Sequence, residues 1–477
     1  MERNEPNTET KRSGPGEAAR KAMGRRDFLL GTATVGAGVM LGRKVLAQED
    51  VAEAEPTIPA AAASSGNPAD QLNIAMIGLG AEGMVLMDAI LRIPDIRVKA
   101  VCDIWEYSLR RGARTLKKFG HEVNSYVDYQ EMLEAENDLD AVVVATPDFM
   151  HAEHAIACMN KGLHVYCEKE MSNDLEKARQ MVVAAKTTGK LLQIGHQRRS
   201  NPRYRHAINR LVLDQKLLGE VTHAYGQWNR AKSDDLGWPK DYEIDQATLE
   251  KYGYASMSHF RNWRWYKKYG GGPIVDLGSH QIDIFTWIFG NNPRSVTAGG
   301  GIDFYQHHEW YDNVMAIFDY ETEAGVSRAF YQVLTTTSNG GFYENFMGTD
   351  GTLVISEVPM RGNHLLKEAH ADIGTWNQAV KAGWLEKEAT PAAPAATDDV
   401  VVDVRVSAAL GSWPLPLEIA KPVHQPHLEN FFNAIRFGEE LNCPAEIGYE
   451  TAVAVLKVNE AVETGQRIMF KPGEFEA

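Results

Sequence analysis

Short apolar runs alternate with helical patterns over the part of the chain that begins near residue 71. Each run ends beside a glycine, a proline or a polar residue, which is typical of buried parallel strands. We interpret as strands the runs Leu72–Ile77, Ile96–Cys102, Ala141–Thr146, Leu163–Cys167 and Leu191–Gly195. Helical spacing is found in Tyr107–Phe119, Glu153–Lys161 and Leu175–Thr188. The alternation predicts an α/β fold over residues 71–195, with a doubly wound parallel sheet covered by helices on both faces.

From about Gly219 the pattern changes to alternating apolar and polar positions, which is typical of strands with one face exposed. The alternating segments are Val221–Gln227, Ser295–Gly300, Asn313–Tyr320, Val326–Tyr331 and Phe342–Met347. Helical spacing occurs in Gly278–Phe289, His427–Phe437 and Tyr449–Thr464. We therefore expect residues 196–477 to form an α+β domain with a large, mostly antiparallel open sheet that serves as a substrate wall. The Ala/Pro segment Thr390–Thr397 is expected to be a surface loop.

Residues 1–47 have the layout of an export signal. Arg25 and Arg26 precede the weakly apolar stretch Phe28–Leu41, and Val45–Ala47 provides a small-residue cleavage site. The twin arginines resemble the signal of the twin-arginine pathway, which exports folded proteins, so we expect a periplasmic or otherwise exported protein. A retained membrane anchor is the alternative, although the stretch is shorter than the roughly 20 residues of a spanning helix. Residues 48–70 are expected to be a linker.

Composition is that of an ordinary soluble globular protein, with 44% hydrophobic and 24% charged residues among 477. The net charge of −15 argues against nucleic acid or an anionic membrane as a partner, because neither is bound through an acidic surface. The cysteines show no metal-ligand spacing, and we interpret them as buried thiols: Cys102, Cys158, Cys167 and Cys443.

The first predicted strand runs directly into the motif Gly78-Leu79-Gly80-Ala81-Glu82-Gly83. A strand that ends in glycines and opens a helix lets the backbone approach a pyrophosphate, and the helix N-terminus offers free N–H groups to it. Asp103, at the end of the second strand, lies at the distance expected for an acid that binds the ribose hydroxyls of a dinucleotide. Gly78, Gly80, Gly83 and Asp103 therefore predict a Rossmann dinucleotide site.

Asp103 also indicates which dinucleotide is bound. Its carboxylate would repel a 2′-phosphate, which favours NAD over NADP. Arg110 and Arg111 follow on the next predicted helix and could soften that preference, so NADP remains the alternative.

Further polar residues lie at the carboxyl ends of the predicted strands, where ligands bind to open α/β sheets. Thr146, Pro147 and His151 follow the third of these strands, and Glu168 and Lys169 follow the fourth. We expect them to surround one crevice.

Asp276 and His280 stand four residues apart, so a helix would place both on one face. Removal of a hydride from a carbinol requires a base for the hydroxyl proton, a role for which histidine is suited, and a carboxylate can orient that base or the substrate. A lysine such as Lys169 would stabilise negative charge on the reacting oxygen. Lys169, Asp276 and His280 are our catalytic candidates.

The chain after Gln71 resembles the glucose–fructose oxidoreductase, inositol dehydrogenase and rhizopine-catabolism family (Gfo/Idh/MocA). The matching segments are Ile77–Gly83, Ala145–Asp148 through His151, Gly162–Lys169 and Gly271–His280. The resemblance implies that the lysine of a Glu-Lys-Pro motif and the residues of an Asp-x-x-x-His motif line the active site; here these are Lys169, Asp276 and His280. Glu170 stands where the family usually has proline, and it adds a negative charge beside Lys169.

Two other segments supply candidate substrate contacts. Aromatic faces beside hydrogen-bonding groups suit sugar rings, and on this ground we predict substrate contacts from Gln197, Arg198, Asn262, Trp263 and Arg264. His307 and His308 would point to opposite faces of a strand, so no metal site is expected there.

The expected protein is an exported oxidoreductase that moves hydride between tightly held NAD and a sugar, cyclitol or glycoside. Export would separate it from free nicotinamide cofactors, so a closed cycle on retained NAD is required. An NAD-dependent glycosidase that oxidises its substrate transiently is one alternative, and a non-catalytic sugar-binding protein is another. The resemblance further implies a homo-oligomer formed through the C-terminal sheet.

Overall fold

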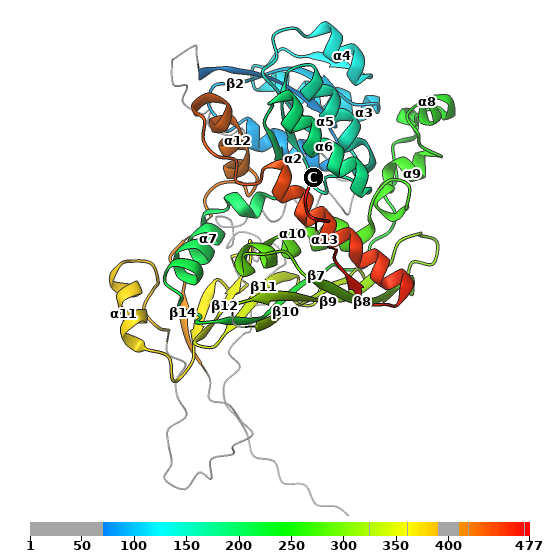
Figure 1. Ribbon diagram of the computed structural model, residues 1–477. Coiled ribbons are helices and arrows are strands. Elements are labelled where there is room, and N and C mark those ends of the chain that lie inside the picture. The colour runs from blue at the N-terminus through cyan, green and yellow to red at the C-terminus, as the bar shows by residue number, and fades with distance from the viewer. Residues whose placement is uncertain (1–69, 324, 360, 390–409, 418, 472) are drawn as a thin grey trace, which may run out of the picture. The chain divides into compact units, whose positions relative to one another are not determined.

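The computed structural model describes residues 70–477 except 324, 360, 390–409, 418 and 472. The expected signal and linker before Asp70, and the expected loop Thr390–Thr397, lie outside the described residues. Two sheets organise this part of the chain (Figure 1). The first has six strands and the second has nine.

The first sheet is entirely parallel, in the order β3-β2-β1-β4-β5-β6. Its strands are β1 (Leu72–Ile77), β2 (Ile96–Cys102), β3 (Asn124–Tyr126), β4 (Ala141–Val144), β5 (His164–Cys167) and β6 (Leu192–Ile194). Its helices are α2 (Ala81–Ile90), α3 (Glu106–Lys118), α4 (Tyr129–Ala135), α5 (Asp148–Asn160) and α6 (Leu175–Thr188). The predicted doubly wound sheet is confirmed. The order reverses between β1 and β4, and such a switch point is where these sheets bind ligands.

Differences from the predicted elements are local. The pattern did not reveal β3 and α4, because three and seven residues are too few for a period to show. Helix α5 begins at Asp148 rather than Glu153, directly behind Pro147, which occupies the N-cap position. The earlier start matters for function because it brings the Asp148 carboxyl to the strand-end edge of the sheet.

The second sheet has the order β14-β13-β12-β11-β7-β10-β9-β8-β15, and within it β7 and β10 pair in parallel while the other pairs are antiparallel. The predicted, mostly antiparallel sheet is confirmed. Its strands are β7 (Val221–Asn229), β8 (Ser295–Gly301), β9 (Asn313–Thr322), β10 (Gly325–Leu334), β11 (Phe342–Gly348), β12 (Gly351–Ile355), β13 (His364–Lys367), β14 (Gly411–Pro414) and β15 (Ile468–Met469).

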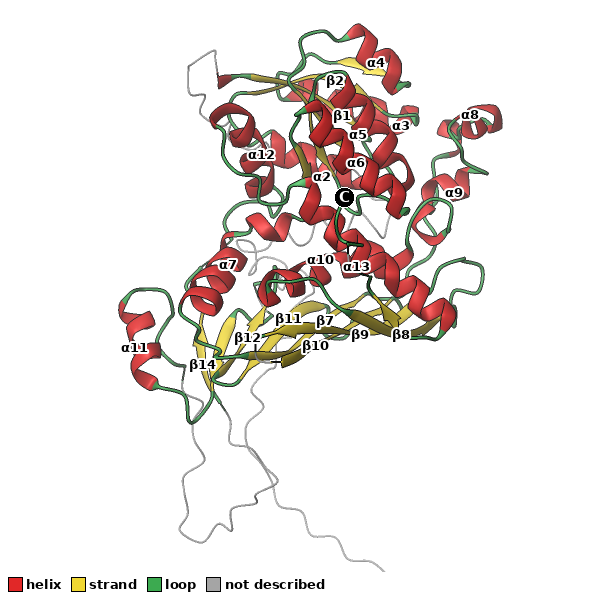
Figure 2. Ribbon diagram, in the orientation of Figure 1, coloured by secondary structure: helices red, strands yellow, loops and turns green. Residues whose placement is uncertain are grey.

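Helices cover one face of this second sheet, as Figure 2 shows. The long helix α10 (Gly272–Phe289) contacts β7, β9 and β10, and α13 (Ala445–Thr464) contacts β8. The other face carries exposed apolar side chains, among them Met315 and Ile317, each 45% exposed. The remaining helices are α7 (Pro202–Arg205), a π-helix (His206–Asp214), α8 (Gln246–Lys251), α9 (Met257–Arg261), α11 (Ile373–Lys381) and α12 (Gln425–Phe437), with 3-10 turns at Gln197–Ser200, Lys240–Tyr242 and Trp263–Trp265.

Two C-terminal helices pack against the first sheet. Leu428, Phe431 and Phe432 of α12 are fully buried with residues of β1, β2 and α2 in one apolar cluster. A second apolar cluster lies on the other side of the sheet. It contains residues of α13, including Ala452 and Val453, together with residues of α5 and α6. The sequence-based division placed all residues after 195 in a second domain; in the structure, part of that segment supplies the first domain's core.

Among the described residues, every helix is too short or too polar to cross a membrane.

Candidate active site

The glycine motif forms a turn that side chains could not replace at two of its three positions. Gly78 has φ +93°, and a Cβ there would lie 2.5 Å from the Ala145 carbonyl oxygen. A Cβ at Gly83 would overlap the Gly78 carbonyl. Gly80 differs, because it has φ −65° and nothing lies within 4 Å of its Cβ position. The space above Gly80 is therefore open.

Helix α2 begins immediately after Gly80 and has no side-chain cap. Its first N–H groups are thus available to an anion, and the helix dipole favours one there. An uncapped helix end beside an open glycine is what the pyrophosphate of a dinucleotide requires, so the residues present fit NAD.

Asp103 lies next to this turn, at the end of β2. Its carboxylate accepts hydrogen bonds from the backbone N–H of Leu79 (2.7 Å) and of Trp105 (2.8 Å). Burial raises the pKa of Asp103 to about 6, while these N–H groups oppose the shift. The carboxylate is ionised at neutral pH, as a ribose-binding acid must be.

The catalytic candidates Lys169 and Asp276 are in contact. The Lys169 ammonium donates to the Asp276 carbonyl oxygen (2.5 Å) and lies 3.4 Å from its Oδ1 atom. Arg264 Nε is 3.2 Å from the same Oδ1, and Arg230 Nη1 is 4.0 Å from Oδ2. Arg264, Lys169 and Arg230 together hold the pKa of Asp276 well below its usual range, against the effect of burial. Asp276 is therefore a permanent carboxylate.

His280 lies one helical turn beyond Asp276 on α10, with 7% of its surface exposed. Its ring is tilted against Trp228 at a centroid distance of 5.2 Å, and its Nδ1 atom has no hydrogen-bond partner among the described residues. Burial and, to a smaller extent, the positive charge of Lys169 lower the pKa of His280 well below its usual value. The imidazole is thus neutral at pH 7, which is the protonation state that a general base requires.

Asp148 joins this group although the sequence did not single it out. It is 3% exposed and accepts a hydrogen bond from the backbone N–H of Gly271, at the N-terminus of α10. Burial and the nearby Asp276 charge raise the pKa of Asp148 to about 7. This carboxyl exchanges its proton in the neutral range.

The other predicted cofactor residues also lie near the strand ends. Thr146 and Pro147 form the turn between β4 and α5. His151 is buried, and its ring nitrogens lie 2.6 Å from the carbonyl oxygens of Thr146 and Glu170. This ring joins two strand-end turns inside the protein.

Glu168 lies against the backbone of a neighbouring strand end. A Cβ at Gly195 would lie 2.7 Å from Glu168 Oε1. The carboxyl accepts hydrogen bonds from the Tyr166 hydroxyl (3.2 Å) and from the Lys169 N–H (3.2 Å). Burial and, to a smaller extent, the negative charge of Glu82 raise the pKa of Glu168 to about 7.

Glu170, which replaces the family's proline, is completely buried. The peptide bond between Lys169 and Glu170 is cis. The side chain accepts a hydrogen bond at Oε1 from the Met171 N–H (2.7 Å), whereas Oε2 has no partner among the described residues. Burial raises the pKa of Glu170 to about 8. The carboxyl is therefore largely protonated at neutral pH and does not add the negative charge that the sequence suggested.

Of the predicted substrate contacts, Gln197 and Arg198 are buried and contact glutamate side chains of the protein itself. Arg198 is 1% exposed and pairs with Glu344 and with Glu357 (3.0 Å). Gln197 Nε2 donates to the same Glu357 (3.3 Å). A polar cluster after a strand end can serve a buried ion-pair network as well as a ligand, and the sequence does not distinguish the two.

The other three candidates lie together, but only two reach the site. Asn262 is buried and exchanges hydrogen bonds with the backbone of Leu236, which fixes a loop. Arg264 contacts Asp276, and its guanidinium lies 4.3 Å from the ring centroid of Trp263. Trp263 and Arg264 thus belong to the group of residues around Asp276, whereas Asn262 fixes the neighbouring loop.

His307 and His308 occupy a turn rather than a strand, so the reason given for separating them was wrong. His308 Nε2 lies 2.8 Å and His307 Nε2 3.5 Å from the two carboxylate oxygens of Asp235. The His308 ring stacks on Trp265 (4.1 Å between centroids) and on Tyr305 (5.1 Å), and the Trp265 and Tyr305 rings also contact each other (5.3 Å). These contacts account for His308 alone, because the His307 side chain is 64% exposed. One ligand atom from each of Asp235, His307 and His308 lies within 4.8 Å of the others, so the spacing of these three residues is compatible with a metal ion.

Arg230 and Trp228 are residues of the site that sequence reasoning missed. Both come from β7 or the residue after it, and Arg230 lies 5.5 Å from the Trp228 ring centroid. The only available signal was the end of an alternating strand, which many positions share.

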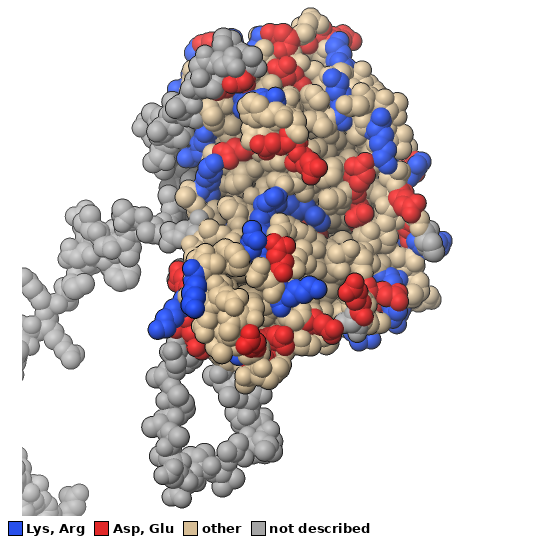
Figure 3. Space-filling model, turned by 60° about the vertical axis from the view of Figure 1, so that its left-hand side comes forward, with Lys and Arg blue, Asp and Glu red and all other residues tan. Residues whose placement is uncertain are grey.

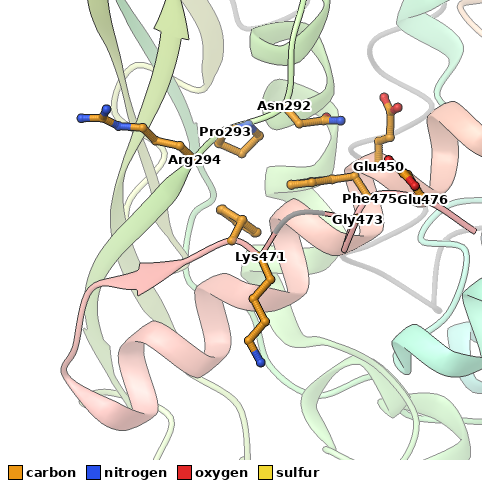
Figure 4. Close-up of a pocket in the computed structure, with 9 residues that line it drawn as sticks. Asn292, Pro293, Arg294, Glu450, Lys471, Gly473, Phe475 and Glu476 are labelled. Atoms are coloured by element: carbon orange, nitrogen blue, oxygen red, sulfur yellow. The ribbon is translucent and has the colours of Figure 1, made fainter.

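A separate surface depression of about 470 Å³ lies near the C-terminus, as Figure 4 shows. None of its lining residues belongs to the group around Asp276; they are Asn292, Pro293, Arg294, Glu450, Phe470, Lys471, Gly473, Phe475 and Glu476.

We predict that Glu170→Gln stabilises the protein increasingly as pH rises. The folded chain holds the Glu170 proton up to about pH 8, whereas the unfolded chain releases it near its ordinary pKa. Stability of the wild type is therefore lost as pH rises from the unfolded to the folded pKa, on the order of 4 kcal/mol by pH 8.

Urea unfolding of both proteins between pH 5 and pH 9 measures this difference. Glu134→Gln, on the exposed face of α4, is the matched control and should show no such trend. A difference between Glu170→Gln and wild type that stays constant with pH would show that Glu170 is ionised when folded.

Comparison with known proteins identifies the family of both domains. Residues 72–196 match the oxidoreductase family with an NAD-binding Rossmann fold, and residues 208–354 match the GFO/IDH/MocA C-terminal domain. A solved structure of levoglucosan dehydrogenase in complex with NADH has the same fold, with a TM-score of 0.62, 18% identity, and coverage of 84% of this chain and 99% of that one.

Two characterised relatives align over shorter stretches. The 4-carboxy-2-hydroxymuconate-6-semialdehyde dehydrogenase of Sphingobium sp. is 30% identical over 171 residues, 35% of this chain and 53% of that protein. The 1,5-anhydro-D-fructose reductase of Ensifer adhaerens is 28% identical over 261 residues, 53% of this chain and 67% of that protein. The chain thus aligns with about half to two thirds of the length of these relatives. With both domains matched, the chain belongs to the Gfo/Idh/MocA oxidoreductase family, and its first domain is that family's NAD-binding Rossmann domain.

Proposed function

We propose that this protein is an NAD-dependent dehydrogenase or reductase that acts on a hydroxyl or carbonyl group of a sugar, cyclitol or glycoside. The observation that carries the proposal is the convergence of a fixed ammonium, Lys169, and a neutral buried imidazole, His280, beside the strand ends of a dinucleotide-binding sheet. The names of relatives, which include an anhydro-sugar reductase and inositol dehydrogenases, support the substrate class.

Each residue has a distinct part in the proposed reaction. His280 accepts the hydroxyl proton, because burial keeps its ring neutral. The charge of Lys169 stabilises the oxygen as it becomes negative. Asp276 contacts Lys169 rather than His280, so its part is to fix the ammonium. Bound NAD supplies the hydride acceptor.

NAD would be held by the turn at Gly80, the N-terminus of α2 and the Asp103 carboxylate. The ionised Asp103 favours NAD over NADP, because it would repel a 2′-phosphate. Arg110, which could have softened this preference, pairs with Glu106 on the exposed face of α3.

We expect Gly80→Ala to weaken NAD binding at least about tenfold, because the methyl group would occupy the space that the pyrophosphate needs. The stability of the cofactor-free protein should change by no more than about 0.5 kcal/mol, since the backbone at Gly80 suits alanine and its surroundings are open. Calorimetric titration with NAD and urea unfolding measure the two effects.

Gly299→Ala is the matched control, because Gly299 also has open space around its Cβ position but lies in β8. Unchanged NAD affinity in Gly80→Ala would refute this placement of the cofactor.

Lys169→Met and His280→Gln should each slow reduction of bound NAD by about 10²–10⁴-fold, the usual cost of losing charge stabilisation or a general base. The measurement is the absorbance of the reduced nicotinamide after mixing with a panel of sugars, cyclitols and aryl glycosides. Lys161→Met, at the exposed C-cap residue that follows α5, is the control for the lost lysine charge.

NAD content after denaturation should stay the same in the three variants, which separates chemistry from cofactor retention. Full activity in His280→Gln would exclude the proposed base. Release of an aglycone without net reduction would indicate the glycosidase reaction instead.

We also propose that the protein is exported through the twin-arginine pathway and reuses one tightly held NAD. The sequence of residues 1–47 supports export, and a dehydrogenase outside the cytoplasm requires retained cofactor. We expect the exported protein to release about one NAD or NADH per chain on denaturation, and Arg25→Lys with Arg26→Lys to keep the protein in the cytoplasm. Export of that double variant, or an exported protein without nucleotide, would contradict the proposal.

Self-association is proposed through the uncovered face of the second sheet. The exposed apolar side chains of Met315, Ile317 and Val326 support this, because apolar groups on one sheet face are stabilised when a second copy covers them.

A further inference from the structure

Positive charge exceeds negative charge around Asp276. On the molecular face in Figure 3, groups of Lys and Arg side chains have Asp and Glu side chains near them. The crevice differs, since Lys169, Arg230 and Arg264 all lie within 4.0 Å of the one carboxylate of Asp276. One carboxylate neutralises one cation, so about two positive charges remain.

Other acids do not remove this excess. Asp148 is the nearest buried carboxyl, and its pKa of about 7 leaves it partly protonated. Even a fully ionised Asp148 leaves three cations against two carboxylates. Glu82, whose charge also acts on Arg264, makes no ion pair with the three cations among the described residues; its Oε1 atom lies 3.2 Å from His424 Nε2.

The two arginines differ from Lys169 in their exposure. Lys169 is 11% exposed, whereas Arg230 is 42% and Arg264 43% exposed. Arg264 contacts Asp276 through Nε, and of the residues that the structure describes no other lies within ion-pair distance of its guanidinium. Its two terminal Nη groups are therefore available to a ligand.

Aromatic rings hold both guanidinium groups in place. Arg264 lies 4.3 Å from the ring centroid of Trp263, and Arg230 lies 5.5 Å from that of Trp228. Trp228 in turn contacts His280. A guanidinium fixed over a ring loses less conformational freedom on binding and presents its planar fork in one orientation.

We propose that Arg230 and Arg264 form an anion subsite, and that the substrate is a sugar derivative with a carboxylate or phosphate group. The proposal rests on the dehydrogenase function above and names its substrate class. Arginine forks bind both kinds of oxyanion through paired hydrogen bonds. The anion would neutralise the excess charge and place the reacting carbon in a fixed position relative to His280 and Lys169.

Equilibrium binding to the NAD-loaded protein tests the subsite without turnover. The probes are D-glucuronate and D-galacturonate with their neutral methyl esters, and glucose 6-phosphate with glucose, measured by calorimetry. We expect at least one anionic probe to bind about tenfold or more tightly than its neutral partner, with a preference that shrinks in high salt. The uronate and phosphate arms identify which oxyanion is bound.

Arg264→Met and Arg230→Met should each reduce this preference to within about threefold while leaving the affinity for the neutral partner nearly unchanged. Arg328→Met is the matched control, because Arg328 is 54% exposed and pairs with Asp319 on the second sheet, away from Asp276. It should keep the preference of the wild type.

Two results would overturn the proposal. One is that no anionic probe binds more tightly than its neutral partner. The other is that Arg264→Met weakens NAD binding as much as probe binding, which would assign the cation to the cofactor. If an anion binds as expected but no sugar reduces bound NAD, the subsite stands and the dehydrogenase function fails.

Discussion

The contact between Lys169 and Asp276 is the constraint on which the arrangement of the site depends. Lys169 is the second residue after β5 of the first sheet, and Asp276 lies in the first turns of α10, which covers the second sheet. Because the ammonium binds both the backbone carbonyl and the carboxylate of Asp276, the two sheets are held together at the position of the proposed chemistry. Asp148 makes a second connection of the same kind through the Gly271 N–H.

Burial raises the pKa of each carboxyl of the site, and neighbouring cations oppose that effect to different extents. Asp276 has three cations around it and remains charged, whereas Glu170 has a backbone N–H alone and keeps its proton to about pH 8. Asp148 and Glu168 lie between these extremes. The number of neighbouring cations therefore decides which acids carry charge, and the crevice is less acidic than its residues suggest.

The sequence predicted the elements whose pattern is long or whose geometry is strict. Except for β3, the parallel strands were found, as were helix α6 and the glycine turn, because apolar runs and Gly78 permit few alternatives. The spacing of Asp276 and His280 likewise required only that α10 be a helix. Contacts between distant segments could not be predicted from the sequence. Nothing in it distinguishes Arg264, which contacts Asp276, from Arg198, which forms ion pairs with Glu344 and Glu357.

The packing of α12 and α13 on the first sheet has a consequence for the order of folding. Phe431 and Val453 belong to apolar clusters on either side of that sheet, more than 200 residues after its last strand, β6, in the chain. A nascent chain that has emerged only as far as β6 cannot yet bury those surfaces, so the first domain reaches its final core when synthesis is nearly complete. Native contacts of such long range slow folding, because a large loop must close before they form. Premature termination anywhere before α12 would consequently disable the N-terminal domain, although all of its strands would be present.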